Sequence, residues 1–251
     1  MKLLTTCALL LSLVAVSLAQ STQQPQMDAN AVVAKMFTHD RQQETTTQGY
    51  EGTRRYILDN EKYHKHSELV VNVTCGVDGV KHFEVVAEDG WKSANKHVLL
   101  KMLESETETS TPSFRTRTRI TPDNYDFSLA GTELVNEQLT YVIDIFPKRE
   151  DKYLLKGRIW VDAHDFALVR VEGQPARNPS FWTRKVHFVH QYRKDGSFWF
   201  PESTQSVTEA RIFGTTNVTI GYFDYKPNSA HAIDSASPQI ARITEGTHDL
   251  H

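Results

Sequence analysis

Two segments of the chain repeat apolar residues at the spacing of an α-helix. Residues 28–43 begin with Asp28, which can cap a helix, and residues 93–106 form the second segment. The apolar stripes of the two segments are Val32, Val33, Met36 and Phe37, then Val98, Leu99, Met102 and Leu103. The polar run 45–49 is expected to end the first helix, and the polar run 104–111 is predicted to be a loop.

Most of the remaining chain alternates apolar and polar residues, which is typical of β-strands. The predicted strands are residues 50–58, 69–75, 81–87, 139–146, 159–161, 166–171, 186–192, 198–201, 203–213 and 217–225. Turn signals separate most of them, as at 193–196, and residues 121–124 are expected to form a short helical turn. The pattern predicts a mainly β protein with a few helices.

Several of the predicted strands are apolar on both faces. Trp160 lies between Ile159 and Val161, so strand alternation puts it on the opposite face, and a tryptophan between two phenylalanines repeats this at 198–200. A sheet with two apolar faces is covered on both, or encloses something on one. Two architectures fit, a two-sheet sandwich and a curved sheet whose hollow holds helices and a guest. The pattern alone favours the sandwich.

The first 19 residues have the features of a secretory signal peptide. A lysine precedes an apolar run shorter than the ~20 residues of a membrane-spanning helix, and Ala19 completes a small-residue cleavage pattern. Residues 20–27 are predicted to be a flexible tether, and the polar residues 227–251 a disordered tail.

Charge and cysteine content narrow the function classes. The net charge is −3, with no basic run or stripe, which argues against a nucleic-acid partner. Cleavage after residue 19 would remove Cys7 and leave Cys75 as the remaining cysteine, so no intramolecular disulfide is expected. A secreted chain without disulfides must bury a large core.

Candidate chemistry is sparse. Asp162, His164 and Asp165 lie between two predicted strands, where a short polar cluster is typical of a turn. His64 and His66 share a strand face, but a metal site needs three or four ligands. The sequence contains neither a G-x-S-x-G nor a G-x-G-x-x-G motif. We therefore expect no catalytic residue, no metal and no cofactor, and a protein that is not an enzyme.

The stretch GRIWVDAHDFALVRVEG resembles a hairpin of the LolA/LolB-like family. In that hairpin, a strand ending in Trp-hydrophobic-Asp turns into a strand ending in hydrophobic-Arg-hydrophobic-Glu, here residues 160–162 and 169–172. Further segments are similar to the family's bacterial outer membrane lipoprotein-sorting branch. They are NYDF at 124–127, the strand 141–147, NPSFW at 178–182 and FWFP at 198–201.

The resemblance implies a strongly curved, unclosed antiparallel β-barrel over residues 28–226, with helices in its mouth. Members of the family bind acyl chains or lipoproteins in an apolar hollow in the periplasm. The expected function is therefore a periplasmic carrier or chaperone for a lipid or an acylated lipoprotein, in trafficking to the outer membrane, with inner- and outer-membrane trafficking proteins as further partners.

The same resemblance gives the expected site residues. Those expected to line the hollow and its lid are Val33, Met36, Phe37, Phe83, Leu99, Met102, Leu103, Tyr141, Ile143, Trp160, Phe188 and Tyr192. The family's carriers use an arginine near the mouth to hold the lid helices closed, and Arg54 or Arg55 is the candidate here.

An envelope sensor or regulator is the alternative. A related family uses the same fold to hold an anti-sigma factor, but its members carry a second C-terminal domain. Here a short polar segment follows Tyr225, which favours the carrier.

Overall fold

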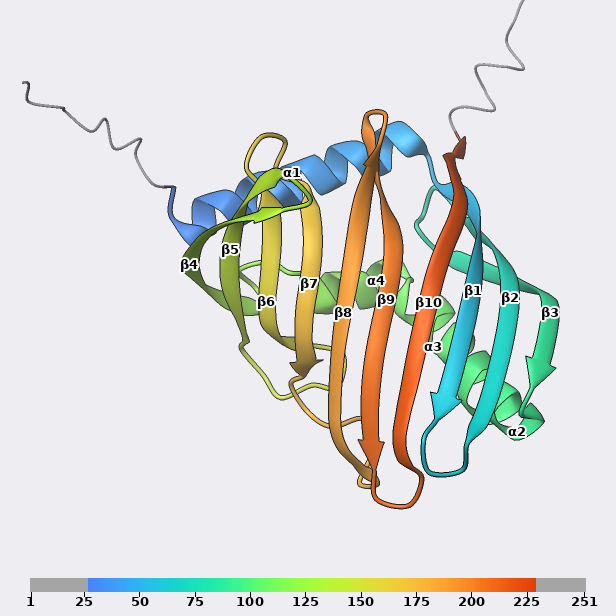
Figure 1. Ribbon diagram of the computed structural model, residues 1–251. Helices are drawn as coiled ribbons and strands as arrows, with labels where there is room; N and C mark the ends of the chain where they lie inside the picture. Colours follow the sequence, from blue (N-terminus) through green and yellow to red (C-terminus); the bar gives the residue numbers. More distant parts are fainter. Residues whose placement is uncertain (1–26, 229–251) are drawn as a thin grey trace, which may run out of the picture.

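The structure, a computed structural model, describes residues 27–228, and its strands form one antiparallel sheet (Figure 1). The strand order is β3-β2-β1-β10-β9-β8-β7-β6-β5-β4. The strands are β1 (Tyr50–Asn60), β2 (Lys65–Cys75), β3 (Lys81–Gly90), β4 (Tyr125–Val135), β5 (Gln138–Pro147), β6 (Leu155–Asp162), β7 (Leu168–Pro175), β8 (Thr183–Asp195), β9 (Phe198–Ala210) and β10 (Gly214–Pro227). The expected signal peptide 1–19, residues 20–26 of the tether and the tail beyond residue 228 lie outside the described residues.

Two runs of consecutive hairpins make up the sheet. One run goes from β1 to β3 and the other from β4 to β10, and they join where β1 pairs with β10, Tyr50 lying opposite Pro227. The strands β3 and β4 are therefore the two edges of the sheet.

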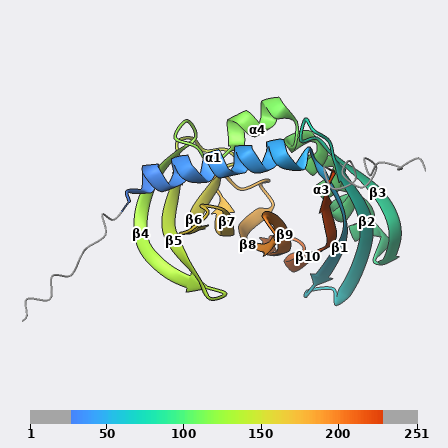
Figure 2. The ribbon, with the colours of Figure 1, turned by 90° about the horizontal axis from the view of Figure 1, so that it is seen from above.

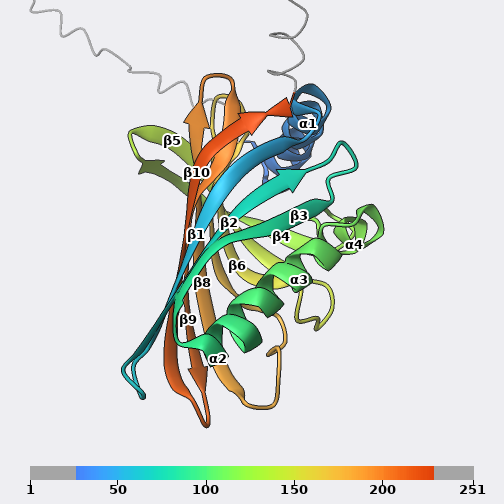
Figure 3. The same cartoon turned by 90° about the vertical axis from the view of Figure 1, so that its right-hand side faces the viewer.

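The sheet curves into an open arc, and the helices lie across its concave side (Figures 2 and 3). Helix α1 (Ala29–Thr47) spans the mouth of the arc (Figure 2). The segment between β3 and β4 supplies α2 (Lys92–Ala94), a π-helical turn (Asn95–Leu99), α3 (Leu100–Thr109) and α4 (Pro112–Thr118). The unclosed half-barrel with helices in its mouth is confirmed, and the two-sheet sandwich is wrong.

Helix α1 begins as its sequence predicts and ends later. The Asp28 side chain caps it by accepting a hydrogen bond from the backbone N–H of Ala31 at 2.8 Å. The predicted breaker 45–49 does end the helix, but only at its last two residues, because the threonines 45–47 remain helical and each of their hydroxyls donates to the carbonyl four residues earlier instead of competing for backbone N–H groups. The helix ends at Gln48, in the left-handed conformation, followed by Gly49 with φ of 92°.

The polar run 104–111 was expected to be a loop, and this expectation is wrong because α3 continues to Thr109. Tertiary contacts hold its last turns, since Glu106 bonds to charged side chains of two strands. The sequence pattern also misses β4, whose alternation is broken by a bulge at Gly131 with φ of 146°.

The predicted strands 198–201 and 203–213 are one strand, β9, which ends at Ala210. Pro201 is tolerated within it because β10 pairs with β9 only as far as Ser203. The tail was predicted to begin at Pro227, but Pro227 still belongs to β10, and the N–H of Asn228 donates to the Gly49 carbonyl.

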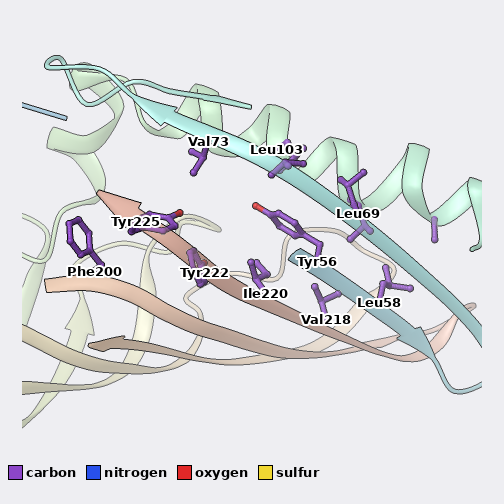
Figure 4. Close-up of a cluster of buried hydrophobic side chains, with 13 residues drawn as sticks. Tyr56, Leu58, Leu69, Val73, Leu103, Phe200, Val218, Ile220, Tyr222 and Tyr225 are labelled. Atoms are coloured by element: carbon purple, nitrogen blue, oxygen red, sulfur yellow. The ribbon is translucent and has the colours of Figure 1, made fainter. Parts of the chain in front are cut away.

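Buried side chains form two large clusters on the concave side. The α3 cluster contains Tyr56, Leu58, Leu69, Val71, Val73, Ala94, Leu99, Leu103, Phe200, Val218, Ile220, Tyr222 and Tyr225 (Figure 4). The α1 cluster contains Ala29, Val32, Val33, Met36, Tyr125, Ile143, Ile145, Leu154, Leu155, Ile159, Val161 and Val171. The apolar stripe of α1 therefore packs in one cluster, and the stripe that continues into α3 packs in the other.

Candidate functional site

Two adjoining cavities of about 310 and 260 Å³ lie beside the C-terminal end of α1, and the smaller one lies where the two clusters meet. Both are lined by Glu44 and Thr47 of α1, Tyr50 of β1, Lys81 of β3 and Glu106 of α3. The smaller cavity, here called the inner cavity, is also lined by Gln43, Arg54, His190, Tyr192, Trp199, Phe200, Pro201 and Tyr222. The helices and the concave face of the sheet therefore enclose a space that is both charged and aromatic.

Arg54 is the most buried charge in this region, with 1% of its side chain exposed. Its Nε donates to the Tyr225 hydroxyl at 2.7 Å, and its Nη1 donates to the Tyr56 hydroxyl at 3.2 Å. Nη1 also donates to Oε2 of Glu106 at 2.8 Å, while Lys81 Nζ donates to Oε1 at 2.7 Å. One carboxylate on α3 is thus held by cations from β1 and β3.

Local periodicity explains why these side chains meet. Arg54 lies two residues before Tyr56 on β1, so strand alternation turns both toward the concave side. Glu106 follows Leu103 by three residues on α3, which puts it on the buried face of the helix. Lys81, the first residue of β3, reaches the same carboxylate from the edge of the sheet.

Mutual attraction keeps all three groups charged. Burial alone would raise the pKa of Glu106, but Lys81 and Arg54 outweigh it and lower that pKa to about 2. Burial likewise opposes the charge on Lys81, and Tyr50 and Glu106 raise the pKa of its ammonium above the ordinary value. The Arg54 guanidinium also lies over the rings of Phe83 and Tyr222, which adds a favourable cation–π contact.

Gln43 fastens the C-terminal half of α1 to the sheet. Near the start of β9 no strand of the described residues pairs on the β10 side, because that pairing ends with Ser203 opposite Gly221. The Gln43 side chain takes this place. Its Nε2 donates to the Trp199 carbonyl at 2.8 Å, and its Oε1 accepts from the Trp199 N–H at 2.8 Å.

The apolar residues expected to line the hollow divide between the two clusters. Val33, Met36, Tyr141, Ile143, Phe188 and Tyr192 lie in or against the α1 cluster, and Phe83, Leu99, Met102 and Leu103 lie in or against the α3 cluster. The interior is therefore not one continuous apolar hollow, since a charged cavity lies where the clusters meet.

Three of the expected site residues lie elsewhere. Phe37 remains 36% exposed beside the Arg119 guanidinium. Trp160 belongs to a third, smaller cluster, because strand alternation turns it away from the α1 cluster. Arg55 points outward and forms an exposed ion pair with Glu68 at 2.7 Å.

The polar stretch at 162–165 forms a turn. Asp162 Oδ1 accepts from the N–H groups of His164 and Asp165, at 2.8 and 2.9 Å. The Asp165 carboxylate accepts from Lys194 Nζ and from the Trp199 indole. Asp162 thus closes the turn, as the turn interpretation predicts, and Asp165 ties it to β8 and β9.

Metal ligands do not gather in the described part of the chain. His66 pairs instead with Asp59 at 2.8 Å on the surface. Within residues 27–228, no three His, Cys, Asp or Glu side chains are placed to hold a metal ion. Over the same residues, no helix is both long and apolar enough to span a membrane.

The sequence analysis did not identify Gln43, Lys81, Glu106 or His190 as site residues. Two of them could have been found from the sequence, because a charged residue occupies a position where the strand or helix period predicts a buried side chain. Lys81 shares strand parity with Phe83, and Glu106 continues the stripe of α3.

Comparisons of sequence give limited information. Residues 121–226 match DUF5686, a family of unknown function. No curated protein matches the chain.

Solved structures with some similarity include three proteins of bacterial origin. A LolA superfamily protein from Nitrosomonas europaea has 10% identity and a TM-score of 0.41, covering 80% of this chain and 93% of that chain. A domain named as an outer membrane lipoprotein-sorting protein, from Vibrio parahaemolyticus, has 12% identity and a TM-score of 0.39, covering 78% and 93%. MucB of Pseudomonas aeruginosa, in complex with MucA, has 9% identity and a TM-score of 0.24, covering 76% and 98%. Likeness at this level carries no function over to this chain.

Proposed function

We propose that this chain is a periplasmic carrier or chaperone that binds lipid or lipoprotein acyl chains between its curved sheet and its helices. The observation that supports this proposal is the aromatic-walled cavity enclosed where α1 crosses the concave side. A guest can enter there without breaking the sheet, because the helices are not part of its hydrogen-bonded ladder.

Burial of acyl chains would supply the affinity. Each CH₂ group removed from water contributes about 0.8 kcal/mol. When α1 moves outward, the α1 cluster loses the contacts of Val32, Val33 and Met36, and an acyl chain can take their place. Methionine suits such a surface because its flexible thioether repacks around guests of different shape.

Few polar contacts hold α1 in place, which makes release feasible. Gln43 bonds to the Trp199 backbone, and Glu44 pairs with Arg115 and Arg119 near α4. A receiving protein that binds the open form would shift the equilibrium toward release. Delivery from an inner-membrane to an outer-membrane partner, after export through residues 1–19, completes the proposal.

Native mass spectrometry of the protein, purified without detergent, tests the proposal. We expect a mass excess that disappears on denaturation and matches a lipid or acylated peptide. Thr47→Phe should fill the cavities and reduce uptake of a fluorescent fatty acid, because Thr47 lines both. Thr45→Phe, on the exposed side of the same helix, is the matched control. A bare chain mass together with no uptake of the probe would refute the carrier.

A regulator that binds a protein partner is the second candidate, and an exposed aromatic pair favours it. Phe181 and Trp182 are 74% and 53% exposed. The backbone N–H of Arg211 donates to the Trp182 carbonyl, and the Arg211 guanidinium lies over the Phe181 ring. Phe181→Ser with Trp182→Ser should abolish capture of a periplasmic protein partner while fatty-acid uptake persists. Capture that is unchanged by these substitutions would refute a role for this surface.

A further inference from the structure

We propose that the inner cavity binds the anionic headgroup of an acyl ligand, a carboxylate or a phosphate, with Lys81 as its donor and Arg54 as a second positive charge behind it. This inference rests on the carrier function proposed above and names the chemical class of its ligand. The cavity would then hold the head of the ligand, and the apolar clusters would hold its chain.

The first support is an excess of positive charge. Arg54 and Lys81 share a single carboxylate, that of Glu106. Among residues 27–228, the Lys81 ammonium has Glu106 as its one hydrogen-bonded side chain, although an ammonium carries three donors. An anion next to Lys81 would use the remaining donors and neutralise the excess charge.

The opposite wall does not supply the missing negative charge. Glu44 of α1 already accepts hydrogen bonds from Arg115 and Arg119, and Arg41 lies 3.8 Å from its other oxygen. The Asp78 carboxylate, between Val77 and Gly79 of the larger cavity's lining, accepts from the backbone N–H of Val80. Glu44 is therefore already paired with arginines that lie outside the inner cavity.

The other titratable groups of the cavity are neutral near neutral pH. Burial, with the charges of Lys81 and Arg54, lowers the pKa of His190 to about 4. Burial raises the pKa of the hydroxyls of Tyr50, Tyr192 and Tyr222, which all line the inner cavity. No tyrosinate or imidazolium among them changes the charge balance.

Lys81 faces the cavity, whereas Arg54 lines it with 1% of its side chain exposed. Lys81 and Glu106 retain 27% and 29% of their side-chain exposure, and both line the inner cavity. A partly buried charge without full compensation is costly. An anion that binds the accessible part of Lys81 would supply that compensation, which water alone does not. Charge-assisted hydrogen bonds to an anion are about twice as strong as neutral ones.

The rest of the wall fits an acyl chain better than a free ion. The aromatic rings of Tyr192, Phe200 and Tyr222 line the same cavity. Phe200 and Tyr222 belong to the α3 cluster, and Tyr192 packs against the α1 cluster. A chain leaving the headgroup site therefore meets apolar surface in both directions.

Isothermal titration calorimetry with matched ligands tests the inference on the whole protein. Oleate is compared with oleyl alcohol, and oleoyl lysophosphatidic acid with 1-oleoylglycerol, all below their aggregation concentrations, with inorganic phosphate as a fifth ligand. We expect each anion to bind at least about tenfold more tightly than its neutral counterpart, since a hydrogen bond to a charged group contributes that much. Inorganic phosphate alone should bind much more weakly than either acyl anion.

Substitutions at Lys81 test whether the tighter binding of the anionic ligand depends on the inner cavity. Lys81→Met should reduce the preference for oleate to about onefold, and Lys81→Arg should retain it. Lys101→Met, at an exposed position on α3, is the control and should leave the preference unchanged. Circular dichroism checks that the variants fold, and the wild-type ligand comparison remains decisive if Lys81→Met does not.

The outcomes separate the two proposals. Equal binding of oleate and oleyl alcohol would overturn the anionic subsite and leave the carrier standing. Binding of inorganic phosphate as tight as that of lysophosphatidic acid, with no binding of the neutral lipids, would overturn both the carrier and the acyl ligand. No binding of any lipid would overturn both.

Discussion

His190 provides a test of the cavity's electrostatics that needs no ligand. It lies on β8, where Nδ1 is hydrogen-bonded to the Thr204 hydroxyl, and its ring contacts those of Tyr192 and Tyr222. Burial and the positive charge of Lys81 lower its pKa from 6.5 to about 4, while Glu106 partly opposes the shift. His190→Gln keeps a polar side chain that does not titrate.

The direction of the pH effect on stability depends on whether the folded or the unfolded protein binds the proton at the higher pH. The unfolded chain protonates this imidazole near its ordinary pKa, whereas the folded protein resists protonation until the pH approaches 4. His190 therefore contributes stability that is present above pH 6.5 and is lost as the pH falls toward 4. The shift corresponds to about 3 kcal/mol in full, and to about 2 kcal/mol between pH 7 and pH 5.

Urea denaturation at pH 7 and pH 5 measures this difference. The wild-type protein should lose about 2 kcal/mol more of its free energy of unfolding than His190→Gln does over this interval. Comparison of the two proteins cancels the contributions of other acidic groups. His97→Gln, at an exposed histidine, should follow the wild type. Equal losses in the wild type and His190→Gln would refute the assignment of a buried, neutral imidazole.

Three further substitutions test other parts of the structure. Glu106→Gln leaves Arg54 and Lys81 without a counterion, so the free energy of unfolding should fall by about 3 kcal/mol in urea titrations. A loss below about 1 kcal/mol would show that this ion pair is not buried. Asp28→Ala removes the cap of α1 and should cost about 1 kcal/mol, and an unchanged denaturation midpoint would contradict the capping bond. Phe181→Ser, at an exposed position, should change stability by no more than about 0.5 kcal/mol, and a larger loss would mean that the ring is packed.

Local patterns were enough to predict much of the architecture. The cap and the apolar stripe of α1, the alternation of β5 and the turn at Asp162 each depend only on residues that are neighbours in the sequence. The same patterns failed at β4, where the bulge at Gly131 interrupts the alternation, and at α3, whose polar end is held by tertiary contacts.

Most of the periodic elements, the mainly β character and the two helical stripes can be predicted from the chain alone, because each depends on interactions between residues a few positions apart. The folded arrangement of the sheet placed β1 beside β10, and so brought Arg54 within reach of Tyr225, 171 positions along the chain. It also brought Glu106 between Arg54 and Lys81, and Gln43 onto the free side of β9. Periodicity shows which face of an element is buried, but it does not show which elements that face meets. The charged cavity depends on this packing between elements, since its residues come from helices and strands far apart in the sequence.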